Sequence, residues 1–326
     1  LGTAARPEIL AELPRERVMA ALDGVDGEVV IEGWRTRTGA TILDRIAELR
    51  ELVGGFLVTF VEREGRLGGI DLEAVEAVVR AADGVPVTVA GGVTTADEVA
   101  AIDRLGADAQ IGMALYTDRL PLADGFMAPL TSDRPDGLWP TVVCDAHGRA
   151  LGLAYSDHES LRRAIDDRRG VYRSRSRGIW MKGETSGAVQ ELLRVDADCD
   201  RDALRFTVRQ AGDGFCHRST WTCWGDDGGL PALERRLRDR LADDAGGSYT
   251  AKLAAEPATL AAKLAEEAAE LAEATTRDEV VWEAADLTYF TAVALARHRV
   301  AWSEVLDELD RRGRAARRRD GSRTDR

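Results

Sequence analysis

Cysteine is scarce in this sequence and unevenly placed. Only four cysteines occur among 326 residues, and three of them, Cys199, Cys216 and Cys223, fall in one short stretch. Four cysteines are too few for a disulfide framework in a chain of this length. Their clustering favours a reducing compartment and a metal site built from thiolates.

Long hydrophobic runs are also missing. No uninterrupted apolar stretch approaches the ~20 residues that a membrane helix requires. The chain opens on Leu1-Gly-Thr-Ala-Ala, without a basic or apolar leader. We therefore expect a cytoplasmic protein with no membrane association and no signal peptide, whose first residues come from the middle of a longer reading frame.

Positive charge is in deficit. The 44 Lys and Arg residues are outnumbered by 57 Asp and Glu residues, which gives a formal net charge of −13. Such a surface repels nucleic acid and anionic membranes unless a local basic patch overrides it. We expect small-molecule substrates and no nucleic-acid partner.

Residues 1–130 alternate short β-rich runs with amphipathic helical stretches. Strands are predicted over 17–22, 56–60, 85–90 and 109–112, and this alternation is typical of parallel βα units. Four such units are half of a (β/α)8 barrel. Because a half barrel leaves two strand edges unpaired, the missing half either lies upstream or comes from another chain.

Composition changes divide the rest of the chain. A β-rich α+β domain is predicted over 131–229, a helical linker over 230–247, an all-α domain over 248–312 and a disordered tail over 313–326. The predicted fold class is therefore multidomain α/β + α, with a partial (β/α)8 barrel first.

The middle domain combines thiolates with a row of carboxylates. Three acidic residues alternate and would share one face of a strand, namely Asp198, Asp200 and Asp202. On that strand Cys199 would point to the other face. Carboxylates suit Mg²⁺ and thiolates suit Zn²⁺, so the segment could serve two metals. With Cys216 and Cys223, three thiolates leave a fourth zinc position for a water, which favours hydrolytic chemistry.

Cations and hydroxyls upstream suit a phosphorylated substrate. Arg173, Arg175 and Arg177 alternate on a predicted strand, and Lys182-Gly-Glu-Thr-Ser-Gly adds a cation, two hydroxyls and backbone amides. Taken alone, the Arg-Ser repeat is typical of a solvated edge, and a Cys-x6-Cys pair is often fortuitous. Their combination favours a binding site.

Together these segments resemble phosphoribosyl-AMP cyclohydrolase. The motifs are Asp133-Arg-Pro-Asp-Gly-Leu, Ser174-Arg-Ser-Arg, Trp180-x-Lys-Gly-Glu-Thr-Ser-Gly, Asp198-Cys-Asp-x-Asp, Gly214-Phe-Cys-His and Cys223-Trp-Gly. The resemblance implies that the three aspartates bind Mg²⁺ and that Cys199 joins Cys216 and Cys223 of a partner subunit around Zn²⁺, in a homodimer. It further implies a catalytic His217 and substrate contacts from Arg175, Arg177, Trp180, Lys182, Thr185 and Ser186.

The helical domain carries paired carboxylates at helical spacing. Glu267 and Glu270 lie three residues apart, and Glu283 and Asp286 repeat this spacing in the next predicted helix. Glu267 and Glu283 both fall in apolar stripes, where a carboxylate needs a counter-charge. One such pair is usually a solvated face, but antiparallel packing of two would converge four carboxylates on one Mg²⁺.

This spacing resembles the helical nucleoside-triphosphate pyrophosphohydrolases. The segments Ser248-Tyr-Thr-x-Lys-Leu and Trp282-Glu-Ala-Ala-Asp-Leu are similar to phosphoribosyl-ATP pyrophosphatase in particular. The resemblance implies a catalytic Glu267, a substrate contact from Lys263, and Mg²⁺ that activates water. The domain order resembles the fungal multifunctional histidine enzymes. We predict cleavage of phosphoribosyl-ATP, followed by opening of the adenine ring of phosphoribosyl-AMP.

The N-terminal segment resembles half of a third enzyme of histidine biosynthesis. Val89-Ala-Gly-Gly-Val-Thr-Thr places Gly91 and Gly92 in a turn where barrels bind phosphate on backbone amides, although the fold alone could require them. The segment is similar to the second half of phosphoribosylformimino-aminoimidazole carboxamide ribotide isomerase. Asp23 matches a catalytic aspartate and Thr59 an active-site threonine. Because the first half is missing, we predict no isomerase activity from this chain alone.

Two alternatives stay open. A zinc-containing nucleic-acid-binding module would use the cysteines structurally and Arg173 to Arg177 on phosphates, although the net charge of −13 counts against it. A salt-sensitive gel shift would support that function. A general nucleotide-cleaning pyrophosphatase would cleave dNTPs as readily as phosphoribosyl-ATP.

Overall fold

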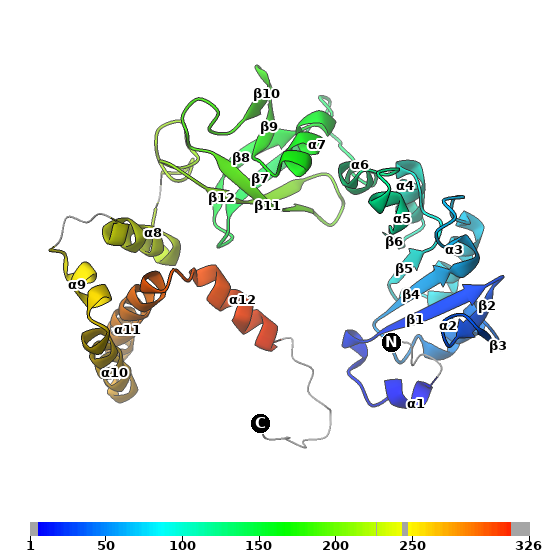
Figure 1. Ribbon diagram of the computed structural model, residues 1–326, viewed down its shortest axis with the longest axis horizontal. Helices are drawn as coiled ribbons and strands as arrows, with labels where there is room; N and C mark the ends of the chain where they lie inside the picture. Colours follow the sequence, from blue (N-terminus) through cyan, green and yellow to red (C-terminus); the bar gives the residue numbers. More distant parts are fainter. Residues whose placement is uncertain (1–5, 226, 243–246, 314–326) are drawn as a thin grey trace.

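The chain folds into three bodies in sequence order. A computed structural model describes residues 6–225, 227–242 and 247–313. Figure 1 shows an α/β body at the N-terminal side, a β-rich body in the middle and a helical body at the C-terminal side. This arrangement confirms the predicted multidomain α/β + α fold class. Of the predicted disordered tail, residues 314–326 lie outside the described residues, and Gly313 is the last residue of a helix.

The N-terminal body is built on a six-stranded sheet of order β3-β2-β1-β4-β5-β6. The strands are β1 Met19–Val25, β2 Glu28–Ile31, β3 Thr36–Thr41, β4 Gly55–Phe60, β5 Val87–Ala90 and β6 Asp108–Gln110. Neighbours in the series β1-β4-β5-β6 are parallel. These four strands are the predicted ones, and they lie side by side in chain order as in half of a barrel.

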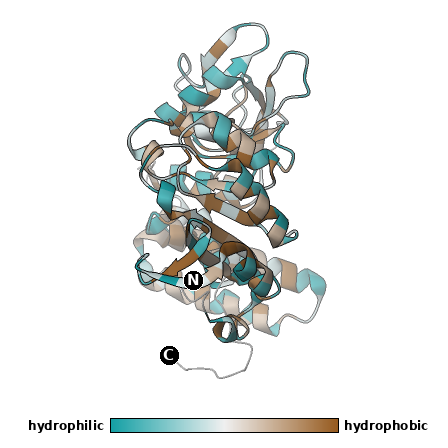
Figure 2. Cartoon of the chain, turned by 90° about the vertical axis from the view of Figure 1, so that its right-hand side faces the viewer, coloured by the Kyte–Doolittle hydropathy of each residue, from teal (hydrophilic) through white to brown (hydrophobic). Residues whose placement is uncertain are grey.

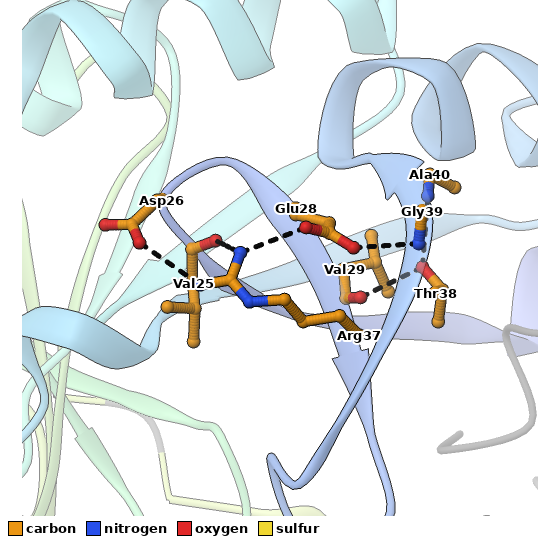
Figure 3. Close-up of polar contacts among 8 residues, drawn as sticks. All are labelled: Val25, Asp26, Glu28, Val29, Arg37, Thr38, Gly39 and Ala40. Atoms are coloured by element: carbon orange, nitrogen blue, oxygen red, sulfur yellow. Dashed lines mark hydrogen bonds and ion pairs between the residues drawn. The ribbon is translucent and has the colours of Figure 1, made fainter.

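The hairpin of β2 and β3 is a difference from the prediction. It pairs antiparallel with β1, so it covers one of the two sheet edges that were expected to be open. Figure 3 shows its polar contacts: the Arg37 guanidinium donates to the Glu28 carboxylate at 3.0 Å and to Asp26 at 3.2 Å, and the Gly39 amide donates to Glu28 at 2.8 Å. Strand β3 is exposed along nearly its whole length. Strand β3 therefore lacks the alternation of apolar and polar residues from which a strand is predicted.

Helices cover the N-terminal sheet. They are α1 Pro7–Leu10, α2 Ile42–Leu49, α3 Leu72–Ala82, α4 Ala96–Arg104, α5 Met113–Tyr116 and α6 Leu122–Met127, with short 3₁₀ turns at 15–17 and 61–63. The side chains of Thr41, Asp71 and Thr95 cap α2, α3 and α4. Helix α6 differs from the others, because Ala123 and Met127 pack into the hydrophobic core of the middle body.

The middle body contains a four-stranded sheet of order β11-β12-β7-β8 and a separate β9–β10 hairpin. Its elements are β7 Trp139–Asp145, β8 Ala150–Ser156, α7 His158–Asp167, β9 Val171–Ser174, β10 Gly178–Met181, β11 Gln190–Ala197 and β12 Leu204–Gln210. Tyr172, Phe206 and Leu161 are fully buried in its core. Figure 2 colours the chain by hydropathy and shows brown, hydrophobic residues along strands and helices, with much of the teal in the loops.

The C-terminal body is entirely helical in its described residues. Its helices are α8 Gly229–Ala242, α9 Tyr249–Ala255, α10 Pro257–Glu273, α11 Arg277–Arg297 and α12 Trp302–Gly313. Pro257 occupies the first turn of α10, where proline is favoured, and Thr276 caps α11. Leu237, Leu253 and Phe290 lie in the core that these helices share. Among the described residues, no helix has the length and apolar character needed to cross a membrane.

Candidate metal and substrate sites

The three aspartates of the middle body lie in a turn rather than on a strand, so the predicted local structure is wrong. Strand β11 ends at Ala197. Arg201 adopts a left-handed backbone with φ of 65°, and the Asp198 carboxylate accepts the backbone N–H groups of Asp202 and Ala203, each at 3.1 Å. The turn nevertheless brings one oxygen each of Asp198, Asp200 and Asp202 within 4.8 Å of one another.

The electrostatics of this turn favour a bound cation. Desolvation raises the pKa of Asp198, but hydrogen bonds from backbone N–H groups outweigh it and lower the pKa overall. Desolvation raises the pKa of Asp202, and the negative charges of Asp200 and Asp198 raise it further. Such repulsion among hard oxygen ligands is relieved by a divalent cation, which these donors fit.

Cys216 and Cys223 lie together in the loop that follows β12. The backbone N–H of Cys223 donates to the Leu151 carbonyl at 2.8 Å, which fastens the loop to β8. Gly152 on β8 permits this approach, since a Cβ there would lie 3.0 Å from the Cys223 sulfur and 2.2 Å from the Phe215 ring. Burial raises the pKa of Cys223, and the neighbouring Cys216 raises it further.

Cys199 does not join this cysteine pair within one chain. It lies exposed in the aspartate turn, and no group of three metal-ligating side chains found among the described residues contains a cysteine. His217 is also exposed, with its ring Nδ1 4.0 Å from the Cys216 sulfur. A single chain therefore supplies two cysteines, Cys216 and Cys223, and the nearby imidazole of His217 to this candidate metal site.

Lys182 lies beside the cysteine pair. The residue is only 9% exposed, and its ammonium is 5.9 Å from the centre of the Phe215 ring. Burial lowers the pKa of Lys182, while the negative charges of Cys223 and Cys216 act in the opposite direction. A buried cation next to thiolates suits an anionic substrate group at this position.

The arginines do not lie on one strand face, which corrects the prediction. Strand β9 ends at Ser174, so only Arg173 is on a strand, where it pairs with Asp157 at 3.3 Å. Arg175 and Arg177 are exposed in the turn before β10, because Ser174 accepts the Arg177 amide at 3.2 Å and closes that turn.

The other predicted substrate contacts lie on β10 or in the segment that follows it. Trp180 is half-buried against Tyr172, with ring centres 5.2 Å apart, whereas Thr185 and Ser186 are exposed. Sequence reasoning missed Tyr155, whose ring lies 4.9 Å from the guanidinium carbons of both Arg134 and Arg175. No motif marked Tyr155, since only the folded turn brings Arg175 over it.

The helical body brings three of its four predicted carboxylates together. One oxygen each of Glu267, Glu270 and Glu283 lies within 4.8 Å of the others. Asp286 is half-buried and lies outside this group. Glu267 is only 6% exposed, and the ammonium of Lys263 lies 3.7 Å from its carboxylate.

Burial and mutual repulsion act together on this carboxylate group. Desolvation raises the pKa of Glu267, and the charges of Glu270 and Asp286 raise it further, against the opposing charge of Lys263. Desolvation and Glu270 likewise raise the pKa of Glu283. Asp286 therefore acts on the group through its charge, and the donor set fits a hard divalent cation.

Moderately acidic pH is expected to stabilise the metal-free helical body. Because the pKa values of Glu267 and Glu283 are raised, the folded chain binds protons more tightly than the unfolded chain just above the ordinary glutamate pKa of 4.5. This contribution is lost as pH rises through the raised values. We expect Tm in EDTA to fall from about pH 5 to about pH 7, and saturating Mg²⁺ to abolish the fall. An E267Q/E283Q variant that shows the same fall would contradict this origin.

Asp23 and Thr59 are neighbours in the N-terminal sheet. They are register partners on the parallel strands β1 and β4, so their side chains share one face. The Trp34 indole N–H donates to the Asp23 carboxylate at 2.9 Å, and both residues line a cavity of about 450 Å³. Trp34 was not singled out from the sequence, since it lies in the turn between the two strands of the unpredicted hairpin.

Gly91 and Gly92 are required by the backbone itself. Their φ values are 93° and 96°, and a Cβ would lie 2.4 Å from the Phe60 carbonyl oxygen and 2.5 Å from that of Gly69. Only glycine fits such positions. The fold therefore accounts for both glycines whether or not they bind phosphate.

Three family models match successive parts of the chain. The histidine biosynthesis protein model matches residues 4–121, the phosphoribosyl-AMP cyclohydrolase model residues 152–225, and the phosphoribosyl-ATP pyrophosphohydrolase model residues 230–313. The aspartate turn and the cysteine pair fall within the second match. The carboxylate group of α10 and α11 falls within the third.

Curated relatives of this chain are multifunctional proteins of histidine biosynthesis. A histidine biosynthesis bifunctional protein of Schizosaccharomyces pombe is 46% identical over 203 residues, 62% of this chain and 49% of the relative. A trifunctional protein of Neurospora crassa is 40% identical over 253 residues, 78% of this chain and 27% of the relative. A bifunctional protein of Vibrio cholerae is 36% identical over 190 residues, 54% of this chain and 90% of the relative. The chain thus spans less than half the length of these fungal relatives.

Proposed function

Since the chain belongs to the histidine-biosynthesis family that joins a phosphoribosyl-AMP cyclohydrolase to a phosphoribosyl-ATP pyrophosphohydrolase, we propose that it catalyses both reactions in series. The helical body hydrolyses phosphoribosyl-ATP to phosphoribosyl-AMP and pyrophosphate, and the middle body then opens the adenine ring of that product. The observation that carries the proposal is that each body gathers its own set of metal-ligating side chains.

In the helical body, Glu267, Glu270 and Glu283 would hold Mg²⁺. A Mg²⁺ ion held there would neutralise charge on the triphosphate and make a water more acidic. Glu267 is the buried member of this group, and its carboxylate would take a proton from the attacking water as the bond between the α- and β-phosphates breaks. Lys263 lies beside this group and would contact the phosphates. Asp286 would add negative charge around the site.

In the middle body, Cys216 and Cys223 would hold Zn²⁺ together with Cys199 of the partner subunit. A Zn²⁺ ion held there would lower the pKa of a water to about 7 and so supply a hydroxide for attack on an electrophilic ring carbon. His217 is close enough to the pair to move a proton during ring opening. Support for a shared site comes from the position of Cys199, which lies apart from the cysteine pair of its own chain.

Substrate phosphate would be held by the cations and hydroxyls around the β9–β10 hairpin, and the aspartate turn would hold Mg²⁺. Lys182 lies deepest, next to the cysteine pair. The other contacts that we propose are Arg175, Arg177, Trp180, Thr185 and Ser186. The proposed unit is a cytoplasmic homodimer that acts on small molecules and binds neither nucleic acid nor membrane.

The N-terminal body is proposed to lack isomerase activity by itself. Asp23 and Thr59 lie side by side, and Gly91 and Gly92 are in place, but these residues occupy only four parallel strands. Opposed catalytic groups from the other half of a barrel are needed for the acid–base step. Asp23 would be the acid–base residue once a complementary half is supplied.

Incubation of the purified chain with phosphoribosyl-ATP, Mg²⁺ and Zn²⁺ tests the proposal. We expect pyrophosphate release, transient phosphoribosyl-AMP and the ring-opened product by mass spectrometry, with no isomerised product. The same preparation with dNTPs distinguishes a general pyrophosphatase, which would cleave them equally fast. Unchanged phosphoribosyl-ATP would overturn the proposal for the helical body, and accumulated phosphoribosyl-AMP that for the middle body.

A further inference from the structure

A charged contact joins the N-terminal body to the aspartate turn of the middle body. The guanidinium of Arg201 forms an ion pair with the carboxylate of Asp103 on α4. The two side chains are 35% and 24% exposed, so the pair is partly shielded from water. No sequence motif linked these residues, which are far apart in the chain.

The backbone of the same turn is tied to the segment that leaves the N-terminal body. The Thr131 amide donates to the Arg201 carbonyl at 3.0 Å, and the Thr131 hydroxyl donates to the Asp200 carbonyl at 3.5 Å. Arg201 has a φ of 65°, which is unfavourable for a residue with a side chain. These contacts hold Arg201 in a conformation that a free turn would seldom adopt.

Arg201 is the only cation in the sequence Asp198-Cys-Asp-Arg-Asp. A guanidinium released from Asp103 has carboxylates on both sides of it in the chain and is an effective counter-ion for them. It would then compete with a divalent cation for the same oxygens. The ion pair with Asp103 directs this charge toward the N-terminal body instead.

We propose that Asp103 is a positioning residue that draws Arg201 away from Asp198, Asp200 and Asp202 and thereby keeps the turn open to a divalent cation. The inference rests on the proposed function, in which this turn binds Mg²⁺. It gives the N-terminal body a role that needs no isomerase activity: the half barrel supports the metal site of the neighbouring cyclohydrolase domain.

Mn²⁺ binding, measured by calorimetry or electron paramagnetic resonance, tests this inference on the full chain. An E267Q/E270Q background removes the carboxylate site of the helical body. We expect D103N to weaken Mn²⁺ binding at the turn by about 10-fold, the lower range for residues that orient metal ligands. The matched control is D97N, which removes an exposed charge from the same helix.

Arg201→Gln separates this mechanism from simple structural support. If Asp103 acts by restraining the Arg201 charge, R201Q binds Mn²⁺ at least as tightly as the background, and D103N/R201Q matches R201Q. If R201Q weakens binding as much as D103N does, the pair merely braces the turn and the inference is overturned. Unchanged binding in D103N also overturns it.

Asp198→Asn distinguishes failure of the inference from failure of the proposed metal site. If D198N loses Mn²⁺ binding but D103N binds normally, the turn is the metal site and only the inference about Asp103 is wrong. Mn²⁺ binding that persists in D198N, or is absent in the E267Q/E270Q background, shows that the turn is not the site. The inference then falls together with that part of the proposed function.

Discussion

Replacing Glu267 by Gln is expected to stop hydrolysis of phosphoribosyl-ATP while the cyclohydrolase step continues on supplied phosphoribosyl-AMP. Gln keeps the shape of the side chain but removes both the charge for the cation and the proton acceptor. Mutating residues that only orient metal ligands lowers metal affinity or activity by about 10–100-fold. Removing a proposed ligand should therefore lower the rate of pyrophosphate release by more than about 100-fold. Pyrophosphate release measures the first step, and absorbance of the ring-opened product measures the second.

Glu266 supplies the matched control for this variant. It is adjacent in sequence, is half exposed and pairs with Lys263 at 2.8 Å, but it lies outside the carboxylate group. E266Q should therefore retain most of the activity. If E266Q and E267Q lose activity equally, the activity depends on negative charge near Lys263 rather than on metal ligation. The assignment of Glu267 as a metal ligand is then wrong.

Misfolding is not expected to explain the loss in E267Q. Neighbouring negative charges help to raise the pKa of Glu267 in the folded chain. Removing its charge therefore relieves repulsion when no metal is present. Without Mg²⁺, E267Q should unfold at a temperature no lower than that of wild type, and it should gain less stability than wild type when Mg²⁺ is added. A markedly lower Tm in EDTA would contradict this account.

Local chemistry in the sequence predicted the elements whose burial is periodic. The Pro257 start of α10 and the four parallel strands follow directly from side-chain preferences and apolar spacing. The β2–β3 hairpin escaped prediction because β3 is exposed on both faces and has no apolar alternation, and its Arg37 contacts form only once the two strands pair. Amino-acid composition does not predict which segments pair as the two strands of a hairpin.

The candidate sites were predicted by residue type better than by local geometry. Asp198, Asp200 and Asp202 do converge, but through a turn set by the left-handed Arg201 and not through strand alternation. Asp286 has the right helical spacing and still lies outside the group of three carboxylates. Spacing places a side chain on a helix face, whereas the packing of α10 on α11 decides which oxygens meet.

Replacing Cys223 by Ala is expected to halt the pathway at phosphoribosyl-AMP. The variant loses one of the two thiolates that lie together in this chain, and with it bound zinc and ring opening, while pyrophosphate release continues. Loss of a proposed ligand should lower ring opening by more than about 100-fold. The matched control is C144A, since Cys144 is a buried cysteine on β7. Full zinc content in C223A would show that Cys223 is not a ligand.

A mixture of two inactive variants tests whether the zinc site is shared between subunits. If Cys199 of one subunit completes the pair of the other, C199A and C223A are each inactive as homodimers. In a mixed dimer, however, both defects fall in one site, because that site takes Cys199 from the C199A subunit and Cys223 from the C223A subunit. The second site keeps all three cysteines. Random exchange makes half of the dimers mixed, so about a quarter of the wild-type ring-opening activity should return. A site built within one chain would give no recovery, since every chain in the mixture then lacks one ligand.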